Sequence, residues 1–160
     1  MSPVRPATRS LANASPVERD AAPVVEAILA DGHALRIPVC GVSMHPALRE
    51  GDVAVIAPFL GLPRIGQIVL ARTAGGPLVV HRLVNVELQS GRRLYRLKGD
   101  TGARADAGVL REELYGRLIA VERDGQCLDA DDPAFAPPER SVGTGRPVSD
   151  AMVAVARRRR

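Results

Sequence analysis

The sequence predicts a mainly β domain with one short N-terminal helix. Two observations carry this prediction. Short runs of β-branched and aliphatic residues, separated by turns rich in Gly, Pro and Asp, recur from residue 33 to residue 126. Aromatic residues make up only 2% of the chain, so a core must be built from Val, Leu, Ile and Ala. With 160 residues, the chain is long enough for one domain with a core and terminal extensions.

The N-terminal part contains two predicted segments. Residues 1–14 are polar with interspersed prolines and are predicted to be disordered. Residues 15–32 predict a short helix, because Ser15 or Asp20 can cap it, prolines fit its first turn and "VVEAIL" supplies an apolar stripe. Gly32 is the expected stop. One helix of this length is too little for a helix-turn-helix module.

From residue 33 to residue 126 the pattern is that of strands. "QSG" separates two of the runs and predicts a long hairpin. The expected strands are "LRIPVC", "DVAVIAP", "GQIVLART", "PLVVHRLVNVEL", "RRLYRLKG" and "ELYGRLIAVERDG". Beyond them, residues 127–160 are rich in Pro, Gly and Asp and end in four arginines, which predicts a C-terminal tail.

Charge and composition limit the functional classes. The net charge is +4, and Arg157, Arg158, Arg159 and Arg160 predict a solvated tail with at most weak contact to an anionic membrane or nucleic acid. Neither a secretory signal nor a membrane span is apparent, so we expect a soluble, cytoplasmic protein with Cys40 and Cys127 reduced. The histidines lie apart without the spacing of metal ligands, so no metal or other cofactor is expected.

Three stretches carry residue types suited to nucleophilic catalysis. Ser43 lies in "GVSMHP", His81 in "PLVVHRLVNV", and Asp100 and Asp106 in "LKGDTGARAD". A serine attacks only when a base takes its proton, a histidine does so near neutral pH, and a carboxylate orients the imidazole. Taken singly, each is also an ordinary turn, strand or capping residue. The sequence leaves open which carboxylate would orient His81.

A family resemblance joins these stretches. "GVSMHPALREGDVAVI" resembles the nucleophile box of the type I signal peptidases and their LexA-like relatives. "GQIVLAR", "VVHRLV", "LKGDTGARAD" and "YGRLIAV" are similar to the family's later boxes and occur in the family's order, from about residue 35 to residue 121. The resemblance implies a fold of coiled β-sheets and a serine endopeptidase that hydrolyses peptide bonds without a metal, with Ser43 as nucleophile.

The base box resembles the histidine subgroup of that family. His81 is followed by Arg82, as in the archaeal and endoplasmic-reticulum-type enzymes, whereas the bacterial enzymes and LexA use a lysine. Lys98 is the only lysine of the chain and lies in the Lys-Gly-Asp turn rather than in the base box. The resemblance implies functional roles for Asp100 and Asp106. The sequence departs from the family in having no stretch like its membrane anchor, and Gly-Gln and Thr-Gly replace the usual Gly-Asp and Asn pair.

Further roles follow for residues around the serine. The Ser43 amide is the expected oxyanion donor, Gly41 is expected to let an extended substrate backbone approach, and Met44 is expected to pack near the pocket. The expected partner is a peptide or protein lying beside "LRIPVC". Two alternatives stay open: a non-catalytic peptide-binding module, and a LexA-like self-cleaving regulator. The latter is disfavoured because the only suitable upstream bond, Cys40–Gly41, lies too close to Ser43.

Overall fold

The computed structural model describes residues 21–73 and 76–138. The helix α2 (Ala21–Ala30) comes first, and two 3-10 turns, η2 (Arg111–Glu113) and η3 (Pro133–Phe135), occur later. The strands are β1 (Leu35–Pro38), β2 (Val53–Ala57), β3 (Ile68–Arg72), β4 (Leu78–Gln89), β5 (Arg92–Lys98), β6 (Leu114–Arg123) and β7 (Gln126–Asp129). The predicted mainly β fold with one short helix is confirmed. Within these ranges, no helix is long and apolar enough to cross a membrane.

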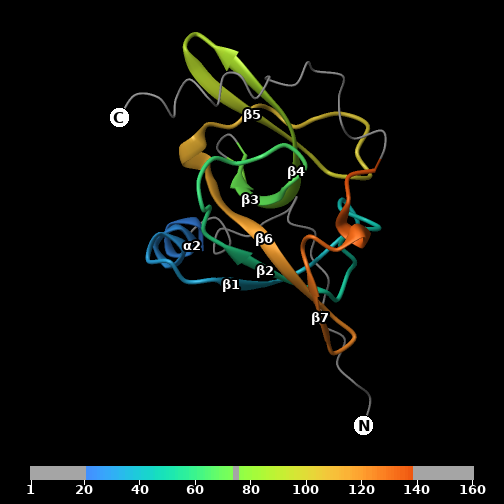
Figure 1. Cartoon of the computed structure of the whole chain (residues 1–160). Helices are drawn as coiled ribbons and strands as arrows, with labels where there is room; N and C mark the ends of the chain where they lie inside the picture. Colours follow the sequence, from blue (N-terminus) through green and yellow to red (C-terminus); the bar gives the residue numbers. More distant parts are fainter. Residues whose placement is uncertain (1–20, 74–75, 139–160) are drawn as a thin grey trace.

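All strand pairs are antiparallel and form one sheet in the order β1-β2-β6-β3-β4-β5. β3 and β7 share one edge of β6: β3 pairs with its first half and β7 with residues 120–123. Figure 1 shows the sheet curling through β3, β4 and β6, with α2 beside β1 and β2. The curl brings the end of β1 and the start of β4, which are far apart in sheet order, to the two sides of one groove.

The predicted hairpin and helix end are confirmed. β4 and β5 are joined through Ser90 and Gly91, whose φ angles of 50° and 77° are those of the two-residue turns that suit the strand twist. α2 ends before Gly32, which has a φ of 86°, and the amides of Gly32 and His33 donate to carbonyls of the last helical turn. The predicted start of this helix, residues 15–20, lies outside the described residues.

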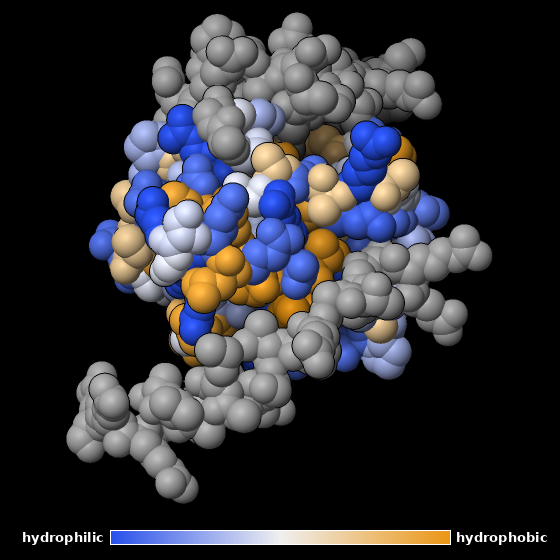
Figure 2. Space-filling model, turned by 90° about the horizontal axis from the view of Figure 1, so that it is seen from above, coloured by the Kyte–Doolittle hydropathy of each residue, from blue (hydrophilic) through white to orange (hydrophobic). Residues whose placement is uncertain are grey.

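The core is built from aliphatic residues on both faces of β3. Ile68 and Leu70 join a cluster with α2, β2, β6 and the loop after β1, whereas Val69 and Ala71 join a second cluster with β4 and β5. This explains how a chain with so few aromatic residues forms a core: the curled sheet covers its central strand on both sides. Figure 2 shows apolar side chains interspersed with hydrophilic ones on the face seen from above.

The predicted boundary at residue 126 is wrong. β7 pairs with β6, the amide of Ala130 donates to the carbonyl of Ile119 (3.0 Å), and Phe135 is only 3% exposed within the first cluster. The folded part therefore continues at least to Phe135, because the Pro- and Asp-rich composition here forms a tight turn against the sheet. The rest of the predicted tail, from residue 139 to Arg160, lies outside the described residues, as does the predicted disordered segment 1–14.

Candidate active site

Ser43 lies in the loop between β1 and β2. Two buried side chains anchor this loop in the first cluster: Met44 (3% exposed) and Leu48 (1% exposed). The amide of Leu48 donates to the carbonyl of Met44 (2.9 Å), so the chain makes a tight turn directly after the serine. Met44 also lines the groove. Gly41, with a φ of 82°, also borders the groove.

An ion pair braces the end of the serine loop. Asp52 accepts hydrogen bonds from the Arg49 amide (2.8 Å) and from Nε (2.9 Å) and Nη2 (2.6 Å) of Arg123. Arg123 also donates to the carbonyl of Ala47 (2.9 Å). Burial raises the pKa of Asp52, but the Arg123 guanidinium and the Arg49 amide outweigh burial and lower this pKa overall. The folded loop therefore favours the carboxylate form of Asp52.

His81, on β4, is oriented by a carboxylate. Its Nδ1 lies 2.6 Å from Oδ2 of Asp106, and both side chains are partly buried. The amide of Asp106 donates to the carbonyl of Leu97 (2.7 Å), which fixes the aspartate backbone against β5. With Nδ1–H given to the carboxylate, a neutral imidazole has Nε2 as its acceptor. This arrangement is the one a general base requires.

Asp100 binds the neighbouring arginine instead. Its two carboxylate oxygens accept from Nε (2.8 Å) and Nη2 (2.7 Å) of Arg82, and both side chains are 1% exposed. Nη1 of Arg82 donates to the carbonyls of Gly66 (2.8 Å) and Phe135 (3.0 Å). Because consecutive strand residues point to opposite faces, the Arg82 side chain points into the interior, whereas the His81 side chain points into the groove. The two carboxylates thus have different partners in the structure: Asp106 contacts His81, and Asp100 pairs with Arg82. The sequence alone left this assignment open.

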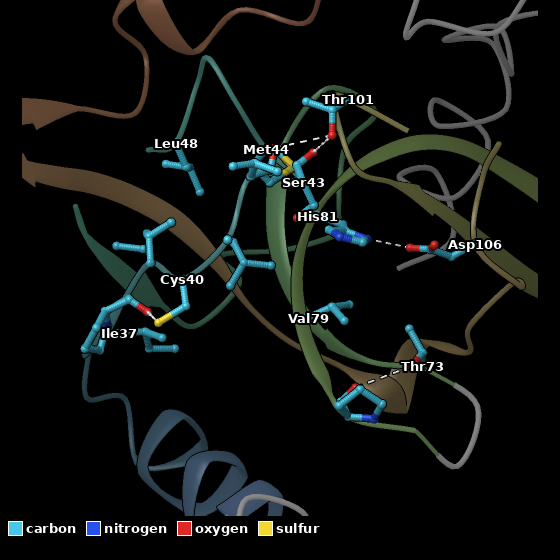
Figure 3. Close-up of a pocket in the computed structure, with 17 residues that line it drawn as sticks. Ile37, Cys40, Ser43, Met44, Leu48, Thr73, Val79, His81, Thr101 and Asp106 are labelled. Atoms are coloured by element: carbon cyan, nitrogen blue, oxygen red, sulfur yellow. Dashed lines mark hydrogen bonds and ion pairs between the residues drawn. The ribbon is translucent and has the colours of Figure 1, made fainter. Parts of the chain in front are cut away.

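The turn after β5 holds the serine loop against His81. The amide of Thr101 donates to the Ser43 carbonyl (3.0 Å), and its hydroxyl lies within 3.3 Å of the carbonyls of Val42 and Ser43. A methyl group placed on Gly99 would lie 3.2 Å from Cβ of Ser43 and 3.4 Å from Nε2 of His81. Ser43 and the imidazole therefore border the same small space beside Gly99, and Figure 3 shows the two side chains next to one another.

A groove of about 680 Å³ leads to this pair. Its polar end holds Ser43, His81, Thr101 and Asp106, and mostly apolar, uncharged residues form the remainder. Figure 3 shows Ile37 and Cys40 on one side of the groove and Val79 and Thr73 on the other. The groove therefore combines an uncharged, largely apolar part with one polar end.

Three further features bear on the chemistry. Within residues 21–73 and 76–138, the Ser43 amide donates to no other group of the protein, which leaves it available to a bound oxyanion. Lys98 ends β5 and does not line the groove. In the same ranges, no three His, Cys, Asp or Glu side chains lie together as metal ligands would.

Sequence reasoning named Ser43, His81 and both aspartates, but it missed how Gly99 and Thr101 join them. It also missed Phe135 as a partner of Arg82, because that residue falls in a segment predicted to be a tail.

No model of a known protein family matches the chain, and a search of curated proteins finds no significant match. The order of the sequence motifs and the geometry of the site therefore carry any functional conclusion.

Proposed function

We propose that this protein is a serine endopeptidase with Ser43 as nucleophile, His81 as general base and Asp106 as the residue that orients the base. The observation that carries the proposal is the 2.6 Å contact between His81 and Asp106, on an imidazole that lies next to Ser43 with its Nε2 bordering the same space beside Gly99. This is the chain of contacts by which an ordinary serine becomes a nucleophile at neutral pH. The resemblance to the histidine-type signal peptidases supports the same assignment.

The reaction proceeds through an acyl-enzyme. Oγ of Ser43 attacks the scissile carbonyl carbon while Nε2 of His81 takes the hydroxyl proton, and Asp106 stabilises the imidazolium that forms. The Ser43 amide donates to the oxyanion of the tetrahedral intermediate. When the C–N bond breaks, His81 gives the proton to the leaving amine. A water molecule then attacks the ester carbonyl while His81 takes its proton. His81 returns this proton to Oγ of Ser43 as the ester C–O bond breaks, which releases the acid product and restores the serine.

The groove favours an extended peptide substrate. Among the described strands, β1 is an edge strand that pairs with β2 alone, and its end borders the groove at residues 37–40. An edge strand offers backbone donors and acceptors to a peptide lying alongside it. Gly41 follows this edge strand and lies directly before the polar end of the groove. The aliphatic lining favours uncharged side chains next to the cleaved bond.

The same groove would serve a non-catalytic peptide-binding module, which is the second candidate. A LexA-like self-cleaving regulator is disfavoured, because the Cys40–Gly41 bond lies in the same loop as Ser43 and two residues before it. A cytoplasmic location, and weak contact of the arginines 157–160 with a membrane or nucleic acid, stay predictions from the sequence.

A fluorophosphonate probe separates an enzyme from a binding module, because it reacts only with an activated serine. We expect the wild-type protein to be labelled, with the adduct mapped to Ser43 by mass spectrometry, and Ser43→Ala to be unlabelled yet folded. Ser90→Gly is the matched control, since it removes a serine from the β4–β5 turn at a φ that glycine accepts. A folded wild-type protein that takes up no label would favour the binding module.

A further inference from the structure

The segment after β6 ends in a buried aromatic residue. β7 returns along β6, and η3 then turns Phe135 into the first core cluster, where it is 3% exposed. Asp132 caps η3 by accepting from the amide of Ala134 (2.8 Å). A chain with only two phenylalanines places one of them here. Both its backbone carbonyl and its ring contact arginines near the candidate site.

The carbonyl of Phe135 binds the arginine beside the base. Nη1 of Arg82 donates to it at 3.0 Å, while the other donors of the same guanidinium bind Asp100 and the carbonyl of Gly66. Arg82 follows His81 on β4, and Asp100 lies in the turn that holds the Ser43 carbonyl. A buried guanidinium needs hydrogen-bond acceptors for all its donors. Loss of one acceptor would therefore shift Arg82, and with it His81 and Asp100.

The ring of Phe135 covers the arginine that braces the serine loop. Cζ of Arg123 lies 5.9 Å from the ring centroid, within the range of a cation–π contact. Arg123 pairs with Asp52 and donates to the carbonyl of Ala47, and both partners belong to the loop that carries Ser43. One residue therefore contacts two buried ion pairs, one behind the base and one behind the nucleophile.

We propose that Phe135 is a positioning residue that fixes Ser43 and His81 relative to one another through Arg123 and Arg82. The proposal rests on the proposed peptidase function for its consequence in catalysis, although the coupling itself is a property of the fold. Phe135 does not line the groove, so it acts on the geometry of the pair and not on substrate binding.

The test compares two variants of the same segment. Phe135→Leu keeps an aliphatic side chain in the core and keeps the backbone carbonyl that accepts from Arg82, but it removes the ring over Arg123 and changes the packing that positions that carbonyl. Leu128→Ala is the matched control, because Leu128 packs against the same cluster from β7 and makes none of the contacts to the two arginines. Both variants are measured well below their unfolding temperatures, so that loss of global stability does not enter.

We expect Phe135→Leu to lower the fluorophosphonate labelling rate and kcat about tenfold with KM unchanged, and Leu128→Ala to change each less than twofold. Amide hydrogen exchange supplies a readout that needs no activity: exchange at Thr101, whose amide donates to the Ser43 carbonyl, should rise about tenfold in Phe135→Leu relative to Leu128→Ala. A combined Phe135→Leu and Arg82→Lys variant should lose less than the product of the two single effects.

The outcomes separate the two proposals. Equal Thr101 exchange in the two segment variants, or labelling at the wild-type rate in Phe135→Leu, overturns the positioning role while leaving the peptidase proposal in place. If the wild-type protein takes up no label but exchange at Thr101 rises as expected, the peptidase proposal fails and the coupling through Phe135 stands. Fully multiplicative effects in the combined variant would mean that Phe135 does not act through Arg82.

Discussion

Gly99→Ala is the perturbation that most directly tests how the site is assembled. The added methyl group would lie 2.9 Å from the Ser43 carbonyl oxygen, whereas ordinary contacts of this kind begin at 3.4 Å. Neither backbone can bend away freely, since Thr101 holds the same carbonyl. The serine loop and the turn must therefore separate by about 0.5 Å, which is the tolerance within which catalytic groups have to be held.

We expect Gly99→Ala to lower kcat/KM and the fluorophosphonate labelling rate of Ser43 about 10- to 100-fold, with a loss of about 1–3 kcal/mol in unfolding free energy. The same methyl group also meets Nε2 of His81 at 3.4 Å, so the distance between nucleophile and base changes directly. Peptide hydrolysis, probe labelling and denaturant unfolding measure these effects.

The control for this variant is Gly108→Ala, a glycine-to-alanine change away from the site. Its methyl group would meet only side-chain atoms, Leu94 at 3.3 Å and Arg96 at 3.5 Å, a milder crowding that involves neither Ser43 nor His81. We expect a smaller stability change and nearly unchanged labelling. Wild-type labelling in Gly99→Ala would refute the reasoning, because it would mean that the turn does not set the position of the serine.

His81→Ala should abolish turnover and Lys98→Met should only impair it; the reverse ranking would indicate a Ser-Lys mechanism. Asp106→Asn should lower kcat with the fold retained. Asp100→Asn should instead cost about 3 kcal/mol of stability by breaking a buried ion pair, and urea unfolding distinguishes the two. Because folding lowers the pKa of Asp52, its stabilisation is full above the unfolded value of about 3.9 and is lost as pH falls through the lower folded value. Asp52→Asn should therefore flatten the dependence of stability on pH below about pH 3.9. Activity should survive EDTA, and a loss restored by zinc would instead indicate a metallohydrolase.

The sequence predicts the sheet well because local signals decide it. Runs of β-branched residues specify the strands from β1 to β6, and the Ser90–Gly91 turn specifies the hairpin. β7 escapes this reasoning, because "QCLD" is four residues long with one large aliphatic side chain, and only its pairing with β6 makes it a strand. The position of Phe135 likewise depends on tertiary contacts that no local pattern encodes.

The candidate site was predictable as a set of residues but not as a set of contacts. Asp100 and Asp106 lie in one short stretch, and their spacing says nothing about which carboxylate meets the imidazole. The turn after β5 decides it, because it sends Asp100 into the interior toward Arg82 and leaves Asp106 at the groove. The role of Gly99 is also set by proximity in space, since its neighbours Ser43 and His81 are remote in the chain.

The hydrogen bond between Arg82 and Phe135 spans 53 residues of the chain, and the contact of Thr101 with the Ser43 carbonyl spans 58. During synthesis from the N-terminus, the serine and the histidine leave the ribosome well before either of these contacts has both its partners. Loop closure over such distances comes late in folding. A nascent chain would therefore carry Ser43 and His81 before the contacts that fix them have formed. The peptidase that we propose would then stay inactive toward its own unfolded segments until Phe135 has emerged and folded against the sheet.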